Sequence, residues 1–214
     1  MLEITDLTKQ KKSDERFNVF LDGRFYCALT AEMIVKEQLK IGSEVSKEHI
    51  DKLQFLSERQ TALNKAVNYL GSRLKTQKQM REYLKSKGYV EGVVKYVLEK
   101  LIEYDFLNDE NFSESFVRVK SKTLGKRRIE MELKQKGVDE KLAKEKTEDI
   151  TGEYEVAGTL AEKYLKNKPR DQKTAQKLYA FLAYRGFISG DINRIIKEQI
   201  KDIKEEVEKD ESWD

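Results

Sequence analysis

The sequence predicts a mainly α-helical protein: three tandem three-helix, helix-turn-helix-like repeats, preceded by a small β-rich extension. First, a Lys or Arg, Gly, apolar pattern recurs at Gly88, Gly137 and Gly186, with a constant spacing of 49 residues. Second, Pro169 is the single proline, so little in the chain interrupts a helix. Third, residues 16–30 alternate between apolar and polar side chains, as strands do. A period of this size is typical of repeats that stack into an elongated array and offer a long surface to a partner.

The N-terminal extension, residues 1–45, is predicted to form short strands over 2–9, 16–21 and 24–29. Asp22-Gly23 lies between the last two and is a strong signal for a two-residue hairpin turn. Thr30 is placed to cap a helix over 31–39 that stops near Gly42. Ser46 is placed to cap a connecting helix over 46–61.

The repeats are expected over 62–110, 111–159 and 160–208, followed by an acidic tail at 209–214. Their predicted helices are 60–72, 76–87 and 90–104, then 109–122, 126–136 and 139–151, then 153–167, 171–185 and 189–208. The helix over 139–151 is short of apolar residues, so we expect it to be the most exposed or least stable of the array. We expect the tail to fray after about Asp202 and Trp213 to be exposed.

Each repeat should end its second helix with a Schellman-type stop. In this motif a glycine with positive φ follows the helix, and the next residue packs back onto an apolar residue of the last turn. The three copies supply the required pairs: Leu84 with Tyr89, Leu133 with Val138, and Leu182 with Phe187. Met80, Ile129 and Leu178 lie four residues before these leucines, on the same helical face.

The composition argues against an enzyme. The 214 residues include one histidine and one cysteine, too few for a Cys/His metal site within the chain. Cys27 lies on a strand face with apolar residues and is expected in the core, and His49 is expected at the surface. There is no phosphate-binding glycine motif. We therefore expect no cofactor and no metal, and the absence of an apolar signal or membrane-spanning run predicts a cytoplasmic protein.

The charge distribution points to an anionic partner. The net charge is only +3, but the segment 118–136 holds eight basic residues against two acidic ones, and 198–214 holds eight acidic residues against three lysines. The sharpest candidate is the segment 122–129, where three cations occupy the first turn of a predicted helix. Cations there oppose the helix dipole, so either a bound anion such as phosphate offsets the cost or the side chains extend into water. Tyrosines on the repeats could stack on bases or pack between helices; they are Tyr69, Tyr83, Tyr89, Tyr96, Tyr104, Tyr179 and Tyr184.

Four stretches resemble the RecX family of recombinase regulators. They are Tyr69-Leu70-x-x-Arg73 with Met80-Arg81-x-x-Leu84-x-x-Lys87-Gly88-Tyr89, Leu107-Asn108-Asp109-Glu110-x-Phe112, Gly125-x-x-Arg128-Ile129-x-x-Glu132-Leu133-x-x-Lys136-Gly137-Val138, and Arg185-Gly186-Phe187. Thr76 and Gln79 stand where the family often has Ser and Glu. The resemblance implies a concave, curved stack of repeats that binds in the groove of the RecA–DNA filament. It further implies modulation, typically inhibition, of RecA's ATPase, strand-exchange and co-protease activities in recombination, DNA repair and the SOS response.

Three hypotheses follow: a non-enzymatic regulator of RecA, a stand-alone DNA-binding module, and a helical scaffold for another protein. The expected partners are the RecA filament and single- or double-stranded DNA, contacted directly or through RecA, with no membrane, and the protein is expected to be a monomer. The candidate contact residues are basic: Arg73, Arg81, Lys87, Lys122, Lys126, Arg127, Arg128 and Lys136. The acidic tail could also fold back onto the basic middle of the chain.

Overall fold

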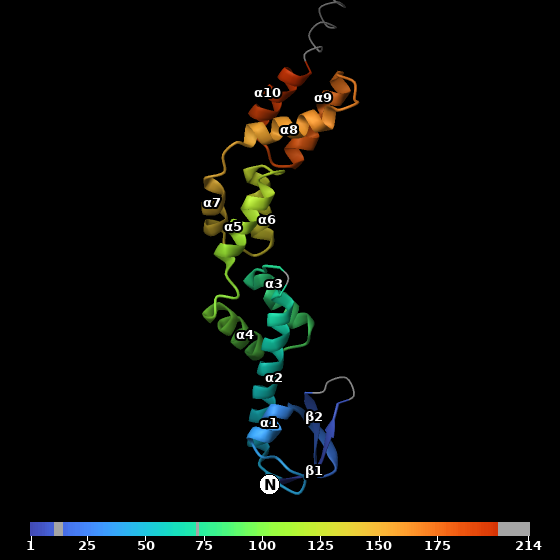
Figure 1. Ribbon diagram of the computed structural model, residues 1–214, viewed down its shortest axis with the longest axis vertical. Coiled ribbons are helices and arrows are strands. Elements are labelled where there is room, and N and C mark those ends of the chain that lie inside the picture. Colours follow the sequence, from blue (N-terminus) through green and yellow to red (C-terminus); the bar gives the residue numbers. More distant parts are fainter. Residues whose placement is uncertain (11–14, 72, 201–214) are drawn as a thin grey trace, which may run out of the picture. The chain divides into compact units, whose positions relative to one another are not determined.

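The computed structural model describes residues 1–10, 15–71 and 73–200. The chain divides into two compact units, Met1–Leu107 and Asn108–Asp214. Four strands are confined to the first unit among the described residues, and helices make up the rest (Figure 1). The tail at 209–214 and Trp213 lie outside the described residues, as does the end of the predicted helix 189–208.

The N-terminal extension is a four-stranded antiparallel sheet of order β3-β2-β1-β4. Its strands are β1 Leu2–Lys9, β2 Arg16–Leu21, β3 Arg24–Thr30 and β4 Glu44–Val45. Asp22 and Gly23 have φ of 47° and 78°, as a two-residue hairpin turn between β2 and β3 requires. The sequence did not predict β4, because a two-residue strand is too short to show alternation. It exists through its pairing with β1, where Leu2 lies opposite Val45.

Both predicted caps at the end of this extension are confirmed. The Thr30 side chain accepts a hydrogen bond from the Met33 amide at the start of α1, Ala31–Lys36. Ser46 caps α2, Lys47–Leu70, in the same way. Helix α1 is shorter than predicted, because Gln38 takes φ of 51° and the following amide, of Leu39, bonds back to the Ile34 carbonyl. This is a Schellman-type stop made with glutamine, so the stop lies earlier than the prediction near Gly42.

Helix α2 is continuous for 24 residues, and the expected boundary at 61/62 falls inside it. Its N-terminal half contributes Ile50 and Leu53 to the core under the sheet. Its C-terminal half contributes Ala62 and Ala66 to the core of the first repeat. One helix therefore belongs to two cores.

The predicted repeats are confirmed as three successive groups of three helices. The first combines the end of α2 with α3 Gln77–Ser86 and α4 Glu91–Glu103; the second has α5 Asp109–Lys120, α6 Lys126–Gln135 and α7 Glu140–Glu148; the third has α8 Glu153–Leu165, α9 Gln172–Tyr184 and α10 Ser189–Gln199. Met80, Ile129, Leu178 and the three stop leucines are all fully buried.

The three helix stops have the predicted geometry. Gly88, Gly137 and Gly186 have φ of 84°, 90° and 88°. In each stop the amide after the glycine bonds to the carbonyl of the stop leucine, over 3.3 Å in the first repeat, 3.1 Å in the second and 3.3 Å in the third. The 49-residue spacing therefore reflects the same supersecondary unit repeated three times.

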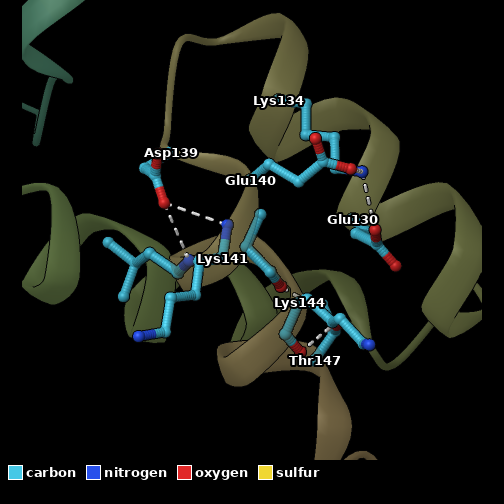
Figure 2. Close-up of polar contacts among 9 residues, drawn as sticks. Glu130, Lys134, Asp139, Glu140, Lys141, Lys144 and Thr147 are labelled. Carbon is cyan, nitrogen blue, oxygen red and sulfur yellow. Dashed lines mark hydrogen bonds and ion pairs between the residues drawn. The ribbon is translucent and has the colours of Figure 1, made fainter.

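The second repeat has the smallest core, with five buried apolar residues. Its last helix, α7, buries only Ala143 and Thr147. Polar contacts hold this helix in place: the Asp139 carboxylate caps its N-terminus, and Lys134 on α6 bonds to Glu140 over 2.6 Å (Figure 2). These two contacts are local and solvated, whereas Lys146 of α7 also bonds to Glu110 and Glu114 on α5, over 2.6 and 2.8 Å.

Candidate functional site

The basic segment 122–129 forms a turn and the first residues of α6. The turn wraps back onto the end of α5, where the amides of Thr123 and Leu124 both bond to the Lys120 carbonyl over 2.9 Å. Leu124 packs against the core of the second repeat. Gly125 is the N-cap, so no side chain of its own satisfies the first amides of α6.

An acidic side chain of the third repeat fills this gap. The Glu153 carboxylate on α8 accepts a 2.7 Å hydrogen bond from the Lys126 amide, the first of α6. The Lys126 ammonium donates to the Glu148 carbonyl at the end of α7, over 3.1 Å. A carboxylate at a helix N-terminus and a cation at a helix C-terminus are both favourable with respect to the helix dipole. At this amide the anion is therefore an internal carboxylate, and the Lys126 amide is not available to a phosphate.

The same turn lies directly against the helix stop of the third repeat. The Gly125 amide donates to the Arg185 carbonyl over 2.9 Å. A Cβ on Gly125 would lie 2.6 Å from the Gly186 carbonyl oxygen, and a Cβ on Gly186 would lie 2.5 Å from the Arg128 amide nitrogen. Side chains do not tolerate such distances, so both glycines are required for the second and third repeats to meet here.

Arg128 and Arg127 follow this junction but have different surroundings. The Arg128 guanidinium bonds to Glu132 over 3.0 Å and lies 4.8 Å from the centre of the Tyr184 ring. Arg127 is exposed and forms no hydrogen bond or ion pair with any residue that the structure describes. The Arg127 charge is therefore available to a partner, whereas that of Arg128 is partly compensated.

These arginines form one wall of a groove with a volume of about 420 Å³ between α6, α9 and α10, which we call the α6–α9 groove. Its apolar lining includes Met131, Tyr179, Tyr184, Phe187 and Ile192. Tyr184 is 69% exposed. The groove thus combines cations with accessible aromatic and aliphatic surface within the second unit.

The other basic candidates are dispersed. Lys122 is exposed and has no partner among the described residues, and Lys136 lies 5.5 Å from the Phe116 ring. In the first unit Arg73 is exposed, Arg81 forms an ion pair with Glu91, and Lys87 lies 5.4 Å from the Tyr83 ring. The structure brings together Lys126, Arg127 and Arg128 on α6.

The tyrosines divide between the two predicted roles, packing between helices and stacking on bases. Tyr69 and Tyr83 stack on each other with ring centres 3.9 Å apart and pack against the core of the first repeat. Tyr104 and Tyr184 are exposed. Tyr184 contacts Arg128, and Tyr179, which is 37% exposed, lines the same groove as the two arginines.

Sequence reasoning missed the roles of Glu153 and Met131. Glu153 showed no signal, because its partner lies 27 residues earlier in the chain. Met131 follows Arg127 by four residues, so helical spacing could have placed both on one face of α6.

Other chemistry is not apparent in the described parts of the chain. No group of three His, Cys, Asp or Glu residues could hold a metal ion there. Cys27 is 2% exposed in the sheet core, where burial raises its pKa to about 11, as expected for a structural thiol. His49 is exposed and lies 3.5 Å from Glu37.

None of the helices in the described ranges has both the length and the apolar character needed to cross a bilayer.

Comparison with known proteins gives matches along most of the chain. Residues 2–46 match the regulatory protein RecX N-terminal domain, and residues 62–101, 108–146 and 152–196 match the first, second and third three-helix domains of RecX. A "Regulatory protein RecX" of Clostridium botulinum (strain Eklund 17B / Type B) is 35% identical over 94% of this chain and 97% of its own. One of Clostridium beijerinckii (strain ATCC 51743 / NCIMB 8052) is 32% identical over 92% and 95%.

Solved structures agree with these matches. A crystal structure of regulatory protein RecX superimposes with a TM-score of 0.64 at 25% identity, covering 94% of this chain and 100% of the other. A crystal structure of RecX from Lactobacillus salivarius gives a TM-score of 0.58 at 31% identity, over 66% and 96%.

Proposed function

Because the chain belongs to the RecX family, we propose that it is a non-enzymatic regulator of RecA recombinase. It would bind the RecA–DNA filament and inhibit its ATPase, strand-exchange and co-protease activities, acting as a monomer in the cytoplasm. The observation that supports this most directly is the cation-bearing start of α6, with Arg127 unpaired among the described residues. A filament of protein on DNA offers repeated acidic and phosphate groups to such a surface.

The contact itself would be electrostatic and distributed. Lysine and arginine contacts to phosphates supply affinity without sequence preference and weaken as salt rises. Arg127 and Lys122 would contribute most, because neither has an internal partner among the described residues. Arg128 and Lys126 would contribute less, since Glu132 and the Glu148 carbonyl already engage them. Arg73, Arg81, Lys87 and Lys136 complete the proposed set.

The test is a titration of the protein into RecA on single-stranded DNA, with ATP turnover and strand exchange measured together. We expect both to fall at stoichiometric amounts. Arg127→Ala should weaken the effect, whereas Lys141→Ala, which removes an exposed charge from α7, should not. Unchanged turnover and exchange with the unaltered protein would rule out the proposal.

The exposed ring of Tyr184 beside Arg128 favours a second candidate, direct binding of DNA without RecA. Aromatic rings next to cations are a common platform for unpaired bases. This candidate predicts binding of a single-stranded oligonucleotide by the protein alone, with an affinity that falls steeply with salt and on Tyr184→Ala. Binding that needs RecA at every salt concentration would exclude it.

A further inference from the structure

The α6–α9 groove has the features of a peptide-binding site. Its apolar side includes Met131 and Tyr179, which are 39% and 37% exposed, and Tyr184 at its edge is more exposed still. Exposed apolar surface next to charged groups is typical of an interaction site. Its volume of about 420 Å³ falls within the range of pockets that hold ligands with an aromatic ring.

The charge of the groove limits what it can hold. The side chains that line it include two arginines and no carboxylate. Glu132, outside the lining, compensates Arg128, and Arg127 has no partner among the described residues. An occupant that satisfies both parts of the groove therefore carries negative charge and at least one large apolar side chain.

The chain's own C-terminal segment has this composition. Between Glu205 and Asp214 there are six acidic residues and one lysine, and Trp213 is the only tryptophan of the protein. The segment follows α10, whose first turn contributes Ser189 and Ile192 to the groove.

The segment is also long enough. Helix α10 has 11 residues and so spans roughly 16 Å. Residues 201–213 can extend over roughly 43 Å, more than twice that length. Because the tail is covalently attached, its effective concentration at the groove is on the order of millimolar, so even a weak contact would be populated.

We propose that the α6–α9 groove binds residues 203–214 of the same chain, with the Trp213 ring against Met131, Tyr179 and Tyr184 and the carboxylates of the tail near Arg127 and Arg128. The bound tail covers Arg127 and excludes other anions from it. The groove is thus an acidic-peptide site whose resident ligand is internal. This docking involves no RecA and no DNA, so it can be true or false independently of the function proposed above.

Trp213 provides a direct probe in the intact protein. In the docked state its emission is shifted to shorter wavelength and is protected from acrylamide quenching, relative to a free peptide of residues 203–214. Arg127→Glu and Tyr184→Ala should each shift the emission to longer wavelength and remove the protection. Lys122→Glu makes the same charge change in the same basic segment outside the groove lining and should leave both unchanged. Far-ultraviolet circular dichroism checks that each variant is folded.

Three results would overturn the proposal. The first is quenching of Trp213 in the unaltered protein at the rate of the free peptide. The second is an equal effect of Lys122→Glu and Arg127→Glu, which would indicate non-specific attraction. The third is protection that increases with protein concentration, which would identify a tail of a second copy as the occupant.

A second measurement tests the exclusion of other anions. Deletion of 203–214 should raise the affinity for a single-stranded oligonucleotide by a larger factor in the unaltered protein than in the Arg127→Glu background. Equal factors in both backgrounds would mean that the gain comes from net charge alone, and would contradict competition for the groove.

Discussion

The carboxylate of Glu153 accepts a 2.7 Å hydrogen bond from the main-chain amide of Lys126 and thereby caps a helix that belongs to the preceding repeat. Three consecutive cations occupy the first turn of that helix. The third repeat therefore supplies the negative charge that the first turn of α6 lacks. The junction between the two repeats and the electrostatics of the basic surface depend on the same side chain.

Replacement of Glu153 by Ala should lower the free energy of unfolding by about 1–2 kcal/mol, because an amide that bonds to a charged acceptor loses its partner. The same change should raise the affinity for inorganic phosphate or an oligonucleotide, since the cations of α6 lose their internal anion. Urea unfolding followed by circular dichroism measures the first effect and anion titration the second. Glu155→Ala removes an exposed carboxylate from the same helix and should produce neither effect. If the two variants behave alike, the cap has no energetic role.

Replacement of Gly186 by Ala should destabilise the protein more than replacement of Gly88 by Ala. Both glycines have positive φ, so each variant loses about 1–2 kcal/mol for a left-handed residue. Only at Gly186 would the new Cβ also meet Arg128, at 2.5 Å, whereas at Gly88 no atom lies within 4 Å. We expect an additional loss of roughly 1–3 kcal/mol from overpacking. Equal shifts in the urea midpoint would contradict the close contact between repeats.

Thr76 closes a capping box at the start of α3. Its hydroxyl accepts from the Gln79 amide, and the Gln79 side chain accepts from the Thr76 amide, both over 3.2 Å. Thr76→Ala should lower the free energy of unfolding by about 1 kcal/mol. Gln79→Glu preserves the reciprocal bond and serves as the control. Thermal unfolding of the two variants compares them directly, and a larger loss in Gln79→Glu would argue against the box.

Stability should decrease in alkaline solution because of Cys27. Burial raises the pKa of this thiol from 9.0 to about 11 in the folded protein. As pH rises, the unfolded chain releases the thiol proton first, so the free energy of unfolding falls between about pH 9 and pH 11. In Cys27→Ala the decrease over this range should be smaller. Tyr26, whose pKa is raised to about 12 chiefly by its hydrogen bond to Asp51, is present in both proteins, so only the lesser contribution of the Cys27 charge to that pKa differs between them. Urea unfolding at several pH values measures the difference.

The sequence predicts those parts of the fold that depend on neighbouring residues. A Schellman stop needs a leucine, a glycine and an apolar residue within six positions, and all three copies contain them. The hairpin at Asp22-Gly23 and the caps at Thr30 and Ser46 are similarly local. The stop at Gln38 uses the same geometry with a residue that gives little signal, because a non-glycine residue at positive φ is held there by its surroundings.

The candidate site was predictable in location but not in detail. The basic composition of 122–129 is visible in the sequence. Which of its cations remain available is only partly visible: Glu132 follows Arg128 by four residues, but Glu153 and Tyr184 come from the next repeat. Arg127 and Arg128 are adjacent and chemically identical, and two contacts distinguish them: the ion pair of Arg128 with Glu132 on the same helix and its contact with Tyr184 of the third repeat.

The length of α2 sets the orientation of the N-terminal sheet about the helix axis. Ile50 and Leu53 face one core, and Ala62 and Ala66 face another, so the two faces are locked in phase along a single rigid rod. Insertion of one residue between Ser57 and Ala62 would turn one face relative to the other by about 100°. Insertion of seven residues, about two turns, would restore the phase to within roughly 20° and lengthen the rod. The distance between the sheet and the first repeat can therefore change only by insertions or deletions of about whole helical turns. This limits how the N-terminal extension can be shortened, extended or grafted onto another protein.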